Sequence, residues 1–318
     1  MASQAPFISI CIPAYKRVNY LQQLLDSIDA QSFRDFEVIV TDDSNDDSVR
    51  KLVDQFDGRY PLRYFRNEVP LGSPGNWNAA VLHATGKWIK IMHDDDWFAD
   101  GESLGVFAQL IRAYPGHAFF FSAYHNYFGG TDVGARHARS SRLKIVERKP
   151  TALLASNVIG PPSVTIYRNE PVFFDEHLKW LVDIDFYIRF LNGRKAKYID
   201  RTLINIGISD EQVTQSSFQN PAVEIPEHLA VLDKLGTGIL NHVLVYDAYW
   251  RLFRNLGIRS VAQIRPYLHD RQQLSPALAR MIRHLGRVPR RLVTIGLFSK
   301  CAMIISFLAN SLSPSPRQ

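Results

Sequence analysis

Cysteine is scarce in this sequence. Only Cys11 and Cys301 occur among 318 residues, and they lie far apart. They cannot form the disulfide framework of a small secreted domain, and they lack the spacing of metal ligands. The N-terminus also lacks a basic region, a long apolar stretch and a small-residue cleavage site, so we expect no export signal. These absences favour a protein of the reducing cytoplasm.

Internal repeats and sustained low-complexity tracts are absent as well. With 46% hydrophobic and 21% charged residues, the chain can bury one large core or a core plus a smaller helical part. The net charge of +6 and the pI near 9.3 indicate anionic partners. Charge alone does not choose between nucleotide diphosphates, nucleic acid and anionic lipid.

Short β-rich runs alternate with helical stretches from residue 6 to about residue 122. This alternation predicts βαβ units and a mostly parallel sheet flanked by helices, in which ligands bind beyond the carboxyl ends of the strands. The predicted strands are FISICI, FEVIVT, LRYFR, KWIKIM and AFFFSA, and the predicted helices cover residues 18–30, 48–56, 76–85 and 102–113.

The pattern changes after residue 123. The polar segment HNYFGGTDVGARHARSSR predicts a long loop or an irregular hairpin over the sheet edge. The runs SVTIYR, DIDFYIRFL and AKYIDRTLINI then predict strand, helix and strand, with Pro161-Pro162 as an extended turn into the first. The chain is predicted to be helical from about Pro221.

The segment IKIMHDDDWF carries the strongest chemical signal, because an apolar strand ends in Asp94, Asp95 and Asp96. Three adjacent carboxylates repel one another, and a divalent cation relieves the repulsion. Oxygen ligands suit Mg²⁺ or Mn²⁺, which often bridge to substrate phosphates. The alternative is a solvated acidic turn that caps the next helix.

A second apolar strand, in EVIVTDDSNDDS, also ends in acids. Asp42 and Asp43 lie at the strand end, where a carboxylate can accept hydrogen bonds from a nucleobase or a ribose hydroxyl. For Ser44, Asp46 and Asp47, capping of the following helix is an equally good interpretation.

Two further segments leave two interpretations open. LGSPGNWNAA, which includes Asn78, is either an anion-binding helix start or a plain strand-to-helix turn. In LKWLVDIDFYIRFL, Asp183 and Asp185 begin an apolar helix. They are either helix-dipole partners or carboxylates whose pKa is raised by burial, which suits proton abstraction from a hydroxyl.

Together these segments resemble the family 2 glycosyltransferases, which have the GT-A fold. The resemblance covers residues 6 to about 215 and includes SICIPAYKR, QSFRDFEVIVTDDSNDDS, LGSPGNWNAA, ATGKWIKIMHDDDWF and DIDFYIRFL with its later QVT. It implies an enzyme that uses a nucleotide-sugar donor, with UDP or dTDP favoured, and a saccharide or lipid-linked acceptor. The implied donor-binding residues are Pro13, Ala14, Tyr15, Asp43, Asn78 and Asp94, and the implied metal ligands for Mn²⁺ or Mg²⁺ are Asp95 and Asp96.

The resemblance also implies that Asp183 is the catalytic base of a single displacement with inversion at the anomeric carbon. The family usually has a Glu-Asp pair at this position, and here Val182 replaces the Glu. His93 replaces the first acid of the family's common Asp-x-Asp-Asp run. A neutral imidazole near the donor and a buried structural histidine are both consistent with His93.

We therefore predict a GT-A catalytic domain over residues 1–220, with a donor-binding half (6–122) and an acceptor and base half (123–220). Residues 221–318 are predicted to form a helical C-terminal region. Its run LVTIGLFSKCAMIISFLANSL has basic residues beside it, which predicts docking on an anionic membrane surface at the inner face of the cell membrane. Packing on the catalytic domain or in a homo-oligomer is the alternative.

Three rival functions are less consistent with the sequence. A sugar nucleotidyltransferase would have a Gly-rich basic loop after the first strand, and PAYKRVNY is not one. A glycoside hydrolase needs paired acids but no metal-suited cluster. A nucleic-acid partner is not expected, because no recognised binding motif with interleaved aromatics occurs. A sugar- or nucleotide-binding protein that has lost turnover remains open.

Overall fold

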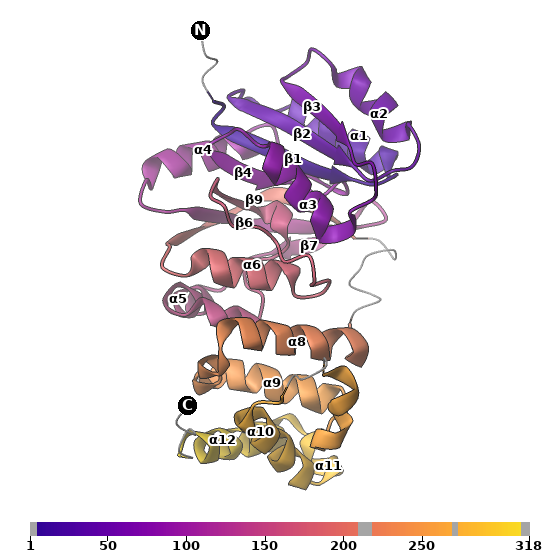
Figure 1. Cartoon of the computed structure of the whole chain (residues 1–318). Helices are drawn as coiled ribbons and strands as arrows, with labels where there is room; N and C mark the ends of the chain where they lie inside the picture. The colour runs from indigo at the N-terminus through magenta and orange to yellow at the C-terminus, as the bar shows by residue number, and fades with distance from the viewer. Residues whose placement is uncertain (1–4, 209–217, 269–272, 313–318) are drawn as a thin grey trace. The chain divides into compact units, whose positions relative to one another are not determined.

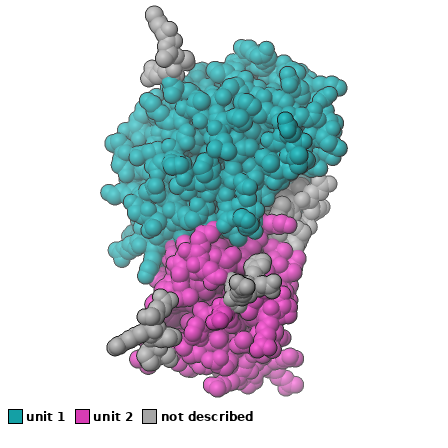
Figure 2. Space-filling view, viewed as in Figure 1, with its two compact units in different colours: residues 1–150, 158–178, 182–212 teal, residues 151–157, 179–181, 213–318 magenta. Residues whose placement is uncertain are grey.

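The computed structural model describes residues 5–208, 218–268 and 273–312, and the chain divides into two compact units (Figure 2). Unit 1 comprises Met1–Pro150, Val158–Leu178 and Val182–Gln212. Unit 2 comprises Thr151–Asn157, Lys179–Leu181 and Val213–Gln318. The two short segments of unit 2 fall inside the range predicted to be catalytic, so a single boundary at residue 220 does not describe this division.

The described part of unit 1 contains one nine-stranded sheet (Figure 1). Its order is β3-β2-β1-β4-β8-β6-β9-β5, with β7 paired to β6. Strands β3, β2, β1 and β4 are parallel, as are β6 and β9, whereas β8, β5 and β7 pair antiparallel. The strands are β1 (Ile8–Ala14), β2 (Phe36–Asp42), β3 (Leu62–Arg66), β4 (Trp88–Ile91), β5 (Asp96–Phe98), β6 (Phe119–Phe128), β7 (Thr131–Arg136), β8 (Thr165–Arg168) and β9 (Ala196–Ile208).

Helices flank this sheet (Figure 1). Every residue of β1, β2 and β4 is buried, as expected for parallel strands covered on both faces. The prediction of a mostly parallel α/β sheet is confirmed. The helices of this unit are α1 (Val18–Asp29), α2 (Ser48–Val53), α3 (Gly72–His83), α4 (Ser103–Ala113), α5 (Ser140–Arg148) and α6 (Val182–Leu191), with short 3-10 helices at η1 (Asp54–Phe56), η2 (Pro150–Leu154) and η3 (Pro162–Val164).

The structure settles one local expectation in favour of its hairpin alternative and adjusts two others. The polar segment after residue 123 is a hairpin, because β6 continues to Phe128 and turns at Gly129 and Gly130, both at positive φ, into β7. Helix α3 begins at Gly72 instead of residue 76, with non-helical dihedral angles at Ser73. The Pro161-Pro162 pair leads into η3, and β8 begins only at Thr165.

Unit 2 is helical in its described residues, with a core of its own. Its elements are α8 (Pro221–Leu235), η4 (Thr237–Asn241), α9 (Val243–Asn255), η5 (Val261–Gln263), η6 (Arg265–Tyr267), α10 (Pro276–Arg287), α11 (Arg290–Val293) and α12 (Gly296–Ser311). Buried side chains such as Tyr249, Trp250, Phe253, Leu278 and Leu285 form the core. Helix α8 starts at the predicted Pro221, where the Asn220 side chain accepts a hydrogen bond from the Ala222 N–H.

Glu227 of α8 explains why a short upstream segment belongs to unit 2. Its buried carboxylate accepts hydrogen bonds from the backbone N–H groups of Lys179, Trp180 and Leu181, at 2.8, 2.9 and 2.9 Å. Such charge-assisted bonds fix the three residues immediately before α6.

Among the described residues, none of the helices combines the length and the apolar character needed to cross a membrane.

Candidate active site

The acidic clusters meet at one edge of the sheet. Strand β1 lies between β2 and β4, and all three are parallel. Asp43 follows β2, and Asp94 to Asp96 follow β4, so both clusters reach the edge where β1 ends at Ala14.

Arg17, just before α1, bridges two of the acids. Its guanidinium forms an ion pair with Asp94, and it donates to Asp95 Oδ2 at 2.7 Å. Asp94 Oδ2 also accepts a hydrogen bond from the Tyr15 N–H, at 3.3 Å. Burial raises the pKa of Asp94 to about 6, while the charge of Arg17 acts in the opposite direction. The loop after β1 is thereby joined to the acidic turn after β4.

Asp96 is as deeply buried as Asp94. It lies in β5 and accepts a hydrogen bond from the Gly207 N–H of β9, at 3.1 Å. A Cβ at Gly207 would lie 2.3 Å from the Asp95 carbonyl oxygen, so this close approach requires glycine. Burial raises the pKa of Asp96, and the side chains of Ser163 and Lys90 act against that rise. The Lys90 ammonium is buried and donates to the Ser163 carbonyl.

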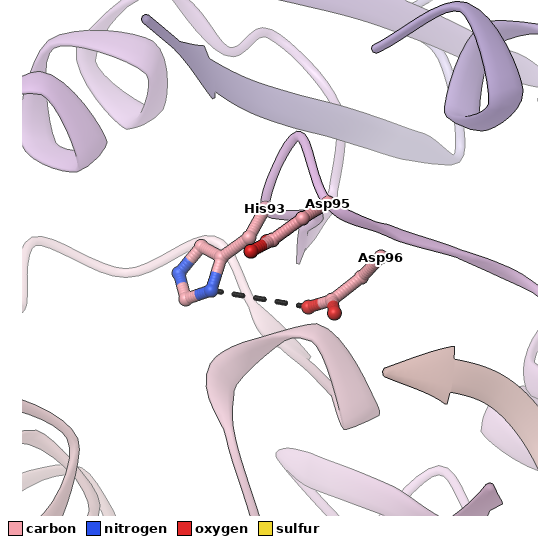
Figure 3. A group of neighbouring side chains, drawn as sticks. All are labelled: His93, Asp95 and Asp96. Atoms are coloured by element: carbon pink, nitrogen blue, oxygen red, sulfur yellow. Dashed lines mark ion pairs between the residues drawn. The ribbon is translucent and has the colours of Figure 1, made fainter. Parts of the chain in front are cut away.

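His93 joins two of the acids in a compact group (Figure 3). One ligand atom from each of His93, Asp95 and Asp96 lies within 4.8 Å of the other two. The His93 Nδ1 is 3.9 Å from Asp96 Oδ2, and the three side chains point toward one another. The Ser163 hydroxyl accepts a hydrogen bond from the His93 N–H at 3.0 Å and fixes the backbone there.

These three residues fit a divalent cation. The His93 Nδ1 faces Asp96, whereas Nε2 lies on the far side of the ring, buried and without a hydrogen-bond partner among the described residues. Burial lowers the pKa of His93 to about 4, so the ring is neutral at neutral pH and keeps a lone pair for a ligand bond. Metal ligands about 2.0–2.2 Å from one ion lie up to about 4.4 Å apart, so the group needs to close only slightly.

Asp43 closes the loop between β3 and α3. Its Oδ1 accepts from Asn67 Nδ2 and the Leu71 N–H, at 2.7 and 3.1 Å, and its Oδ2 accepts from the Gly72 N–H at 2.8 Å. A carboxylate can accept about four hydrogen bonds, so Oδ2 retains capacity for one more donor. Pro13 and Ala14 end β1 beside this loop, and Tyr15 after them is half exposed.

Asn78 lies in α3 and is buried. Its Nδ2 donates to the Phe174 carbonyl and to Glu176 Oε1, at 2.9 and 2.8 Å, and its Oδ1 accepts from the Phe174 N–H at 2.9 Å. The structure therefore gives Asn78 a positioning role for residues 174–176. Direct donor contact by Asn78 stays a prediction.

Asp183 stands in the first turn of α6, and its Oδ1 accepts a hydrogen bond from the Ile184 N–H at 2.8 Å. It lies close enough to Tyr124 and Tyr187 to raise the pKa of both phenols, together with burial. Tyr187 donates to the Gly160 carbonyl at 3.1 Å. Residues 160–163 thus connect Gly160, which bonds Tyr187 near Asp183, with Ser163, which bonds the His93 backbone.

Other acids in these segments have structural partners. Asp185 is fully buried and bonds Arg189 Nε at 2.7 Å. Asp46, one residue before the N-cap Asp47, accepts from the N–H of Ser48, the first residue of α2, at 2.9 Å, and Asp47 pairs with Arg66. The capping interpretation therefore describes Asp46.

A separate cavity of about 330 Å³ lies between α5 and the first residues of β6 and β9. Its lining includes His117, Phe121, Val146, Lys195 and Tyr198 and contains none of the predicted site residues. It begins near the amino ends of β6 and β9, whereas the acids gather at the carboxyl ends of β1, β2 and β4. We assign the chemistry to the acidic edge.

Arg17, Lys90 and Ser163 were not predicted as site residues. A lysine inside the apolar strand WIKI was an available signal, because a buried ammonium requires oxygen partners. Arg17 had no comparable local signal, since its partners lie more than 75 residues away in the sequence.

Comparison with known proteins supports the family expected from the motifs. The family model described as "Glycosyl transferase family 2" matches residues 9–173, just over half of the chain. Abequosyltransferase RfbV of Salmonella typhimurium is 38% identical over 103 residues, which are 31% of each chain. A GalNAc(5)-diNAcBac-PP-undecaprenol beta-1,3-glucosyltransferase of Campylobacter jejuni is 32% identical over 120 residues, 36% of this chain and 37% of that protein. The chain spans less than two thirds of the length of these curated relatives.

Solved structures share the fold over nearly the whole chain. Staphylococcus aureus TarS 1–349 in complex with UDP-GlcNAc aligns with a TM-score of 0.63 at 18% identity, over 96% of this chain and 89% of that one. The mannosyltransferase PcManGT from Pyrobaculum calidifontis, in complex with GDP-Man and Mn²⁺, aligns with a TM-score of 0.57 at 15% identity, over 98% and 89%. The expected GT-A fold is confirmed, and the chain belongs to glycosyl transferase family 2.

Proposed function

We propose that this protein is a glycosyltransferase that moves a sugar from a nucleotide diphosphate donor, preferably UDP- or dTDP-linked, to an acceptor hydroxyl with inversion at the anomeric carbon. One observation carries the proposal: the turn after β4 places Asp94 against the loop after β1 and gathers His93, Asp95 and Asp96 into a cation-sized group. TarS and PcManGT, which share the fold, were solved with UDP-GlcNAc and with GDP-Man and Mn²⁺.

The nucleotide is proposed to lie at the end of β1. Pro13, Ala14 and the exposed Tyr15 would hold the base, and the remaining lone pair of Asp43 Oδ2 would accept from a base N–H. Asp94 would accept from a ribose hydroxyl, since its carboxylate already faces the Tyr15 backbone. Asn78 would act through residues 174–176, which it positions.

A divalent cation, Mn²⁺ or Mg²⁺, is proposed to bind Asp95 and Asp96. We add His93 as a third ligand, because its Nδ1 faces Asp96 at 3.9 Å and its ring is neutral at neutral pH. An imidazole ligand favours Mn²⁺ over Mg²⁺, which prefers oxygen ligands. When bound, the cation would neutralise negative charge on the departing diphosphate.

Asp183 is proposed to accept the proton from the acceptor hydroxyl. Its half-buried carboxylate stands at the amino end of α6, near the phenols of Tyr124 and Tyr187. Both phenols keep their protons because burial and the charge of Asp183 raise their pKa. The Tyr187 proton is held by the Gly160 carbonyl, so Tyr124 is the phenol proposed to donate a hydrogen bond to the acceptor. A single displacement by the deprotonated hydroxyl needs no covalent sugar intermediate.

The acceptor is proposed to be a saccharide, free or lipid-linked, in the synthesis of cell-surface polysaccharide or glycolipid at the inner face of the cell membrane. The name of the Campylobacter jejuni relative includes a PP-undecaprenol saccharide, which is a lipid-linked acceptor. The basic and apolar helices of unit 2 are consistent with this location.

One observation favours a second candidate, a sugar- or nucleotide-binding protein without turnover. Arg17 holds both Asp94 and Asp95, and Val182 stands where the family usually has Glu. Metal-dependent release of nucleoside diphosphate from a donor would exclude this candidate, because binding alone breaks no bond.

The test is a thermal-shift panel of nucleotide sugars with and without Mn²⁺, followed by an assay of nucleoside diphosphate release. We expect one donor to stabilise the protein only when Mn²⁺ is present, in proportion to its affinity. Asp95→Asn should abolish this metal dependence, while Asp54→Asn, at an exposed acid paired with Arg50, should keep it. Equal stabilisation with and without Mn²⁺ by every donor would contradict the metal assignment.

A further inference from the structure

Helix α12 packs against the other helices of unit 2 through apolar Met303, Ala302 and Phe307 and through hydrogen-bonded polar side chains. Ser299 accepts a hydrogen bond from Trp250 Nε1 at 3.1 Å, and Ser306 bonds both Tyr246 and His284, at 2.7 and 2.8 Å. Asn310 bonds the Tyr246 hydroxyl and Arg280. The serines are buried although they are polar. These bonds fix how α12 is rotated about its own axis.

The opposite face of α12 is apolar and exposed. Leu297, Ile305 and the following Leu312 are 74%, 68% and 85% exposed. Successive residues of a helix are rotated by about 100°, which places all members of the set on one stripe about 120° wide. We call this set the α12 stripe, and its members are Leu297, Phe298, Cys301, Ile304, Ile305, Leu308 and Leu312.

This arrangement differs from the usual one. A helix on the surface of a globular protein normally turns its apolar stripe to the core and its polar stripe to water. Helix α12 turns hydrogen-bonded Ser299 and Ser306 inward beside Met303, and it carries a second, continuous apolar stripe outward. Exposed apolar patches of this kind mark surfaces that bind another apolar phase.

The distribution of charged residues indicates which apolar phase the α12 stripe binds. The last 48 residues contain eight Lys or Arg and no Asp or Glu, whereas the rest of the chain has 29 Lys and Arg against 31 Asp and Glu. The net positive charge of the protein is therefore concentrated around α12. Arg283, Arg287, Arg290 and Arg291 are exposed on α10 and α11, the two elements before it.

We infer that the α12 stripe is a docking surface for an anionic lipid bilayer, with α12 lying in the plane of the interface and the arginines of α10 and α11 at the lipid headgroups. Its 16 residues span about 24 Å, less than the roughly 30 Å of a bilayer core, and its polar face stays bonded to unit 2. A second copy of the chain fits less well, because a two-fold interface would bring the same arginines together. This inference deepens the proposed membrane location and rests on it.

The chain provides its own reporter for the test. Cys301 is exposed and lies within the stripe, whereas Cys11 is buried. A thiol-reactive, polarity-sensitive dye therefore labels Cys301 in the full chain without any substitution. Vesicles of phosphatidylcholine containing one third phosphatidylglycerol should shift the dye emission to the blue and sediment with the protein, whereas pure phosphatidylcholine vesicles should bind at least about tenfold more weakly.

Two variants separate the apolar and charged contributions. The stripe variant Leu297→Gln/Ile305→Gln/Leu308→Gln should lower the affinity for anionic vesicles by at least about tenfold, because three side chains no longer gain from leaving water. The arginine variant Arg287→Gln/Arg290→Gln/Arg291→Gln should lower it similarly at low salt and remove most of the salt dependence. Leu82→Gln, at a 69% exposed leucine of α3, is the matched control and should bind as the wild type does.

Vesicle binding is measured without donor, and nucleoside diphosphate release is measured without vesicles, so failure of docking and failure of the proposed chemistry are distinguishable. Three results would overturn the inference: no binding by the wild-type chain, equal binding to neutral and anionic vesicles, or a stripe variant within about twofold of the wild type. A dimer that the stripe variant dissociates, without vesicle binding, would assign the stripe to a second copy. Thermal unfolding of each variant verifies that it is folded.

Discussion

Arg17 competes with the proposed cation for Asp95, and the change that tests this is Arg17→Ala. In the structure the guanidinium binds Asp94 and Asp95, whose side chains are 2% and 10% exposed, while its own side chain is 33% exposed. A cation on Asp95 would take the place of one guanidinium contact. Removal of Arg17 should therefore weaken the metal-free protein and strengthen its metal binding.

The magnitudes follow from burial. Removing one partner of a fully buried ion pair costs about 3–5 kcal/mol, and the partial exposure of Arg17 reduces this to about 2 kcal/mol. For a chain of this size, about 1 kcal/mol shifts Tm by roughly 2 °C, so the metal-free variant should melt roughly 4 °C lower. If the cation must displace one guanidinium contact at a cost of about 1.4 kcal/mol, the variant should bind Mn²⁺ about tenfold more tightly.

Titration calorimetry with Mn²⁺ and thermal unfolding with and without Mn²⁺ measure both effects. Arg63→Ala is the matched control, because Arg63 is 41% exposed and pairs with the buried Glu37 at 2.7 Å, away from the acids after β4. It should lower Tm and leave the Mn²⁺ affinity unchanged. Arg17→Lys should fall between the wild type and Arg17→Ala in both measurements. Equal or weaker Mn²⁺ binding by Arg17→Ala would refute the competition.

Three further predictions concern single side chains. Asp183→Asn should keep the thermal shift given by the donor but lower transfer by about 10²–10⁴-fold, and near-normal turnover would remove Asp183 from the role of base. His93→Gln should weaken Mn²⁺ binding at least about tenfold and reduce the preference for Mn²⁺ over Mg²⁺ in calorimetry, whereas an unchanged preference would exclude the imidazole as a ligand. Glu227→Gln should destabilise the protein by about 2–3 kcal/mol, because the carboxylate accepts three backbone N–H groups. Glu224→Gln, at a partly exposed acid that accepts one such bond, is its control in thermal unfolding.

The parallel sheet could be predicted from the sequence because each buried strand is a short, continuous apolar run followed by polar residues. FEVIVTD and WIKI are such runs, and the structure has β2 and β4 there. Parallel strands end at the same edge, so the meeting of the acids after β2 and β4 followed from the sequence pattern as well. The hairpin of β6 and β7 was predicted as one of two alternatives, because the segment contains Gly129-Gly130. The length of β6 was not predicted.

The partners of the site acids could not be predicted in the same way. Asp94 and Arg17 are 77 residues apart, and only the order of strands in the sheet brings them into contact. The imidazole of His93 posed the same difficulty, because its environment is formed by Ser163 and by Trp77, whose ring centroid is 4.6 Å from that of His93. A sequence motif predicts that a carboxylate lies at the end of a strand. Which cationic side chain pairs with that carboxylate depends on the tertiary packing.

Helix α12 shows this limit most clearly, because its apolar run is visible in the sequence but the direction it faces is not. In a run such as LFSKCAMIISFLANSL, the apolar residues alone would be assigned to the core and the serines to the surface. In the structure the serines are buried beside Met303, where they bond Trp250, Tyr246 and His284, and the α12 stripe is exposed. Buried polar groups must be paired, so these partners determine the rotation of the helix and leave its apolar side outward. The unusual exposure of the α12 stripe is thus a consequence of polar packing inside unit 2, and it turns toward solvent the face that an anionic bilayer can cover.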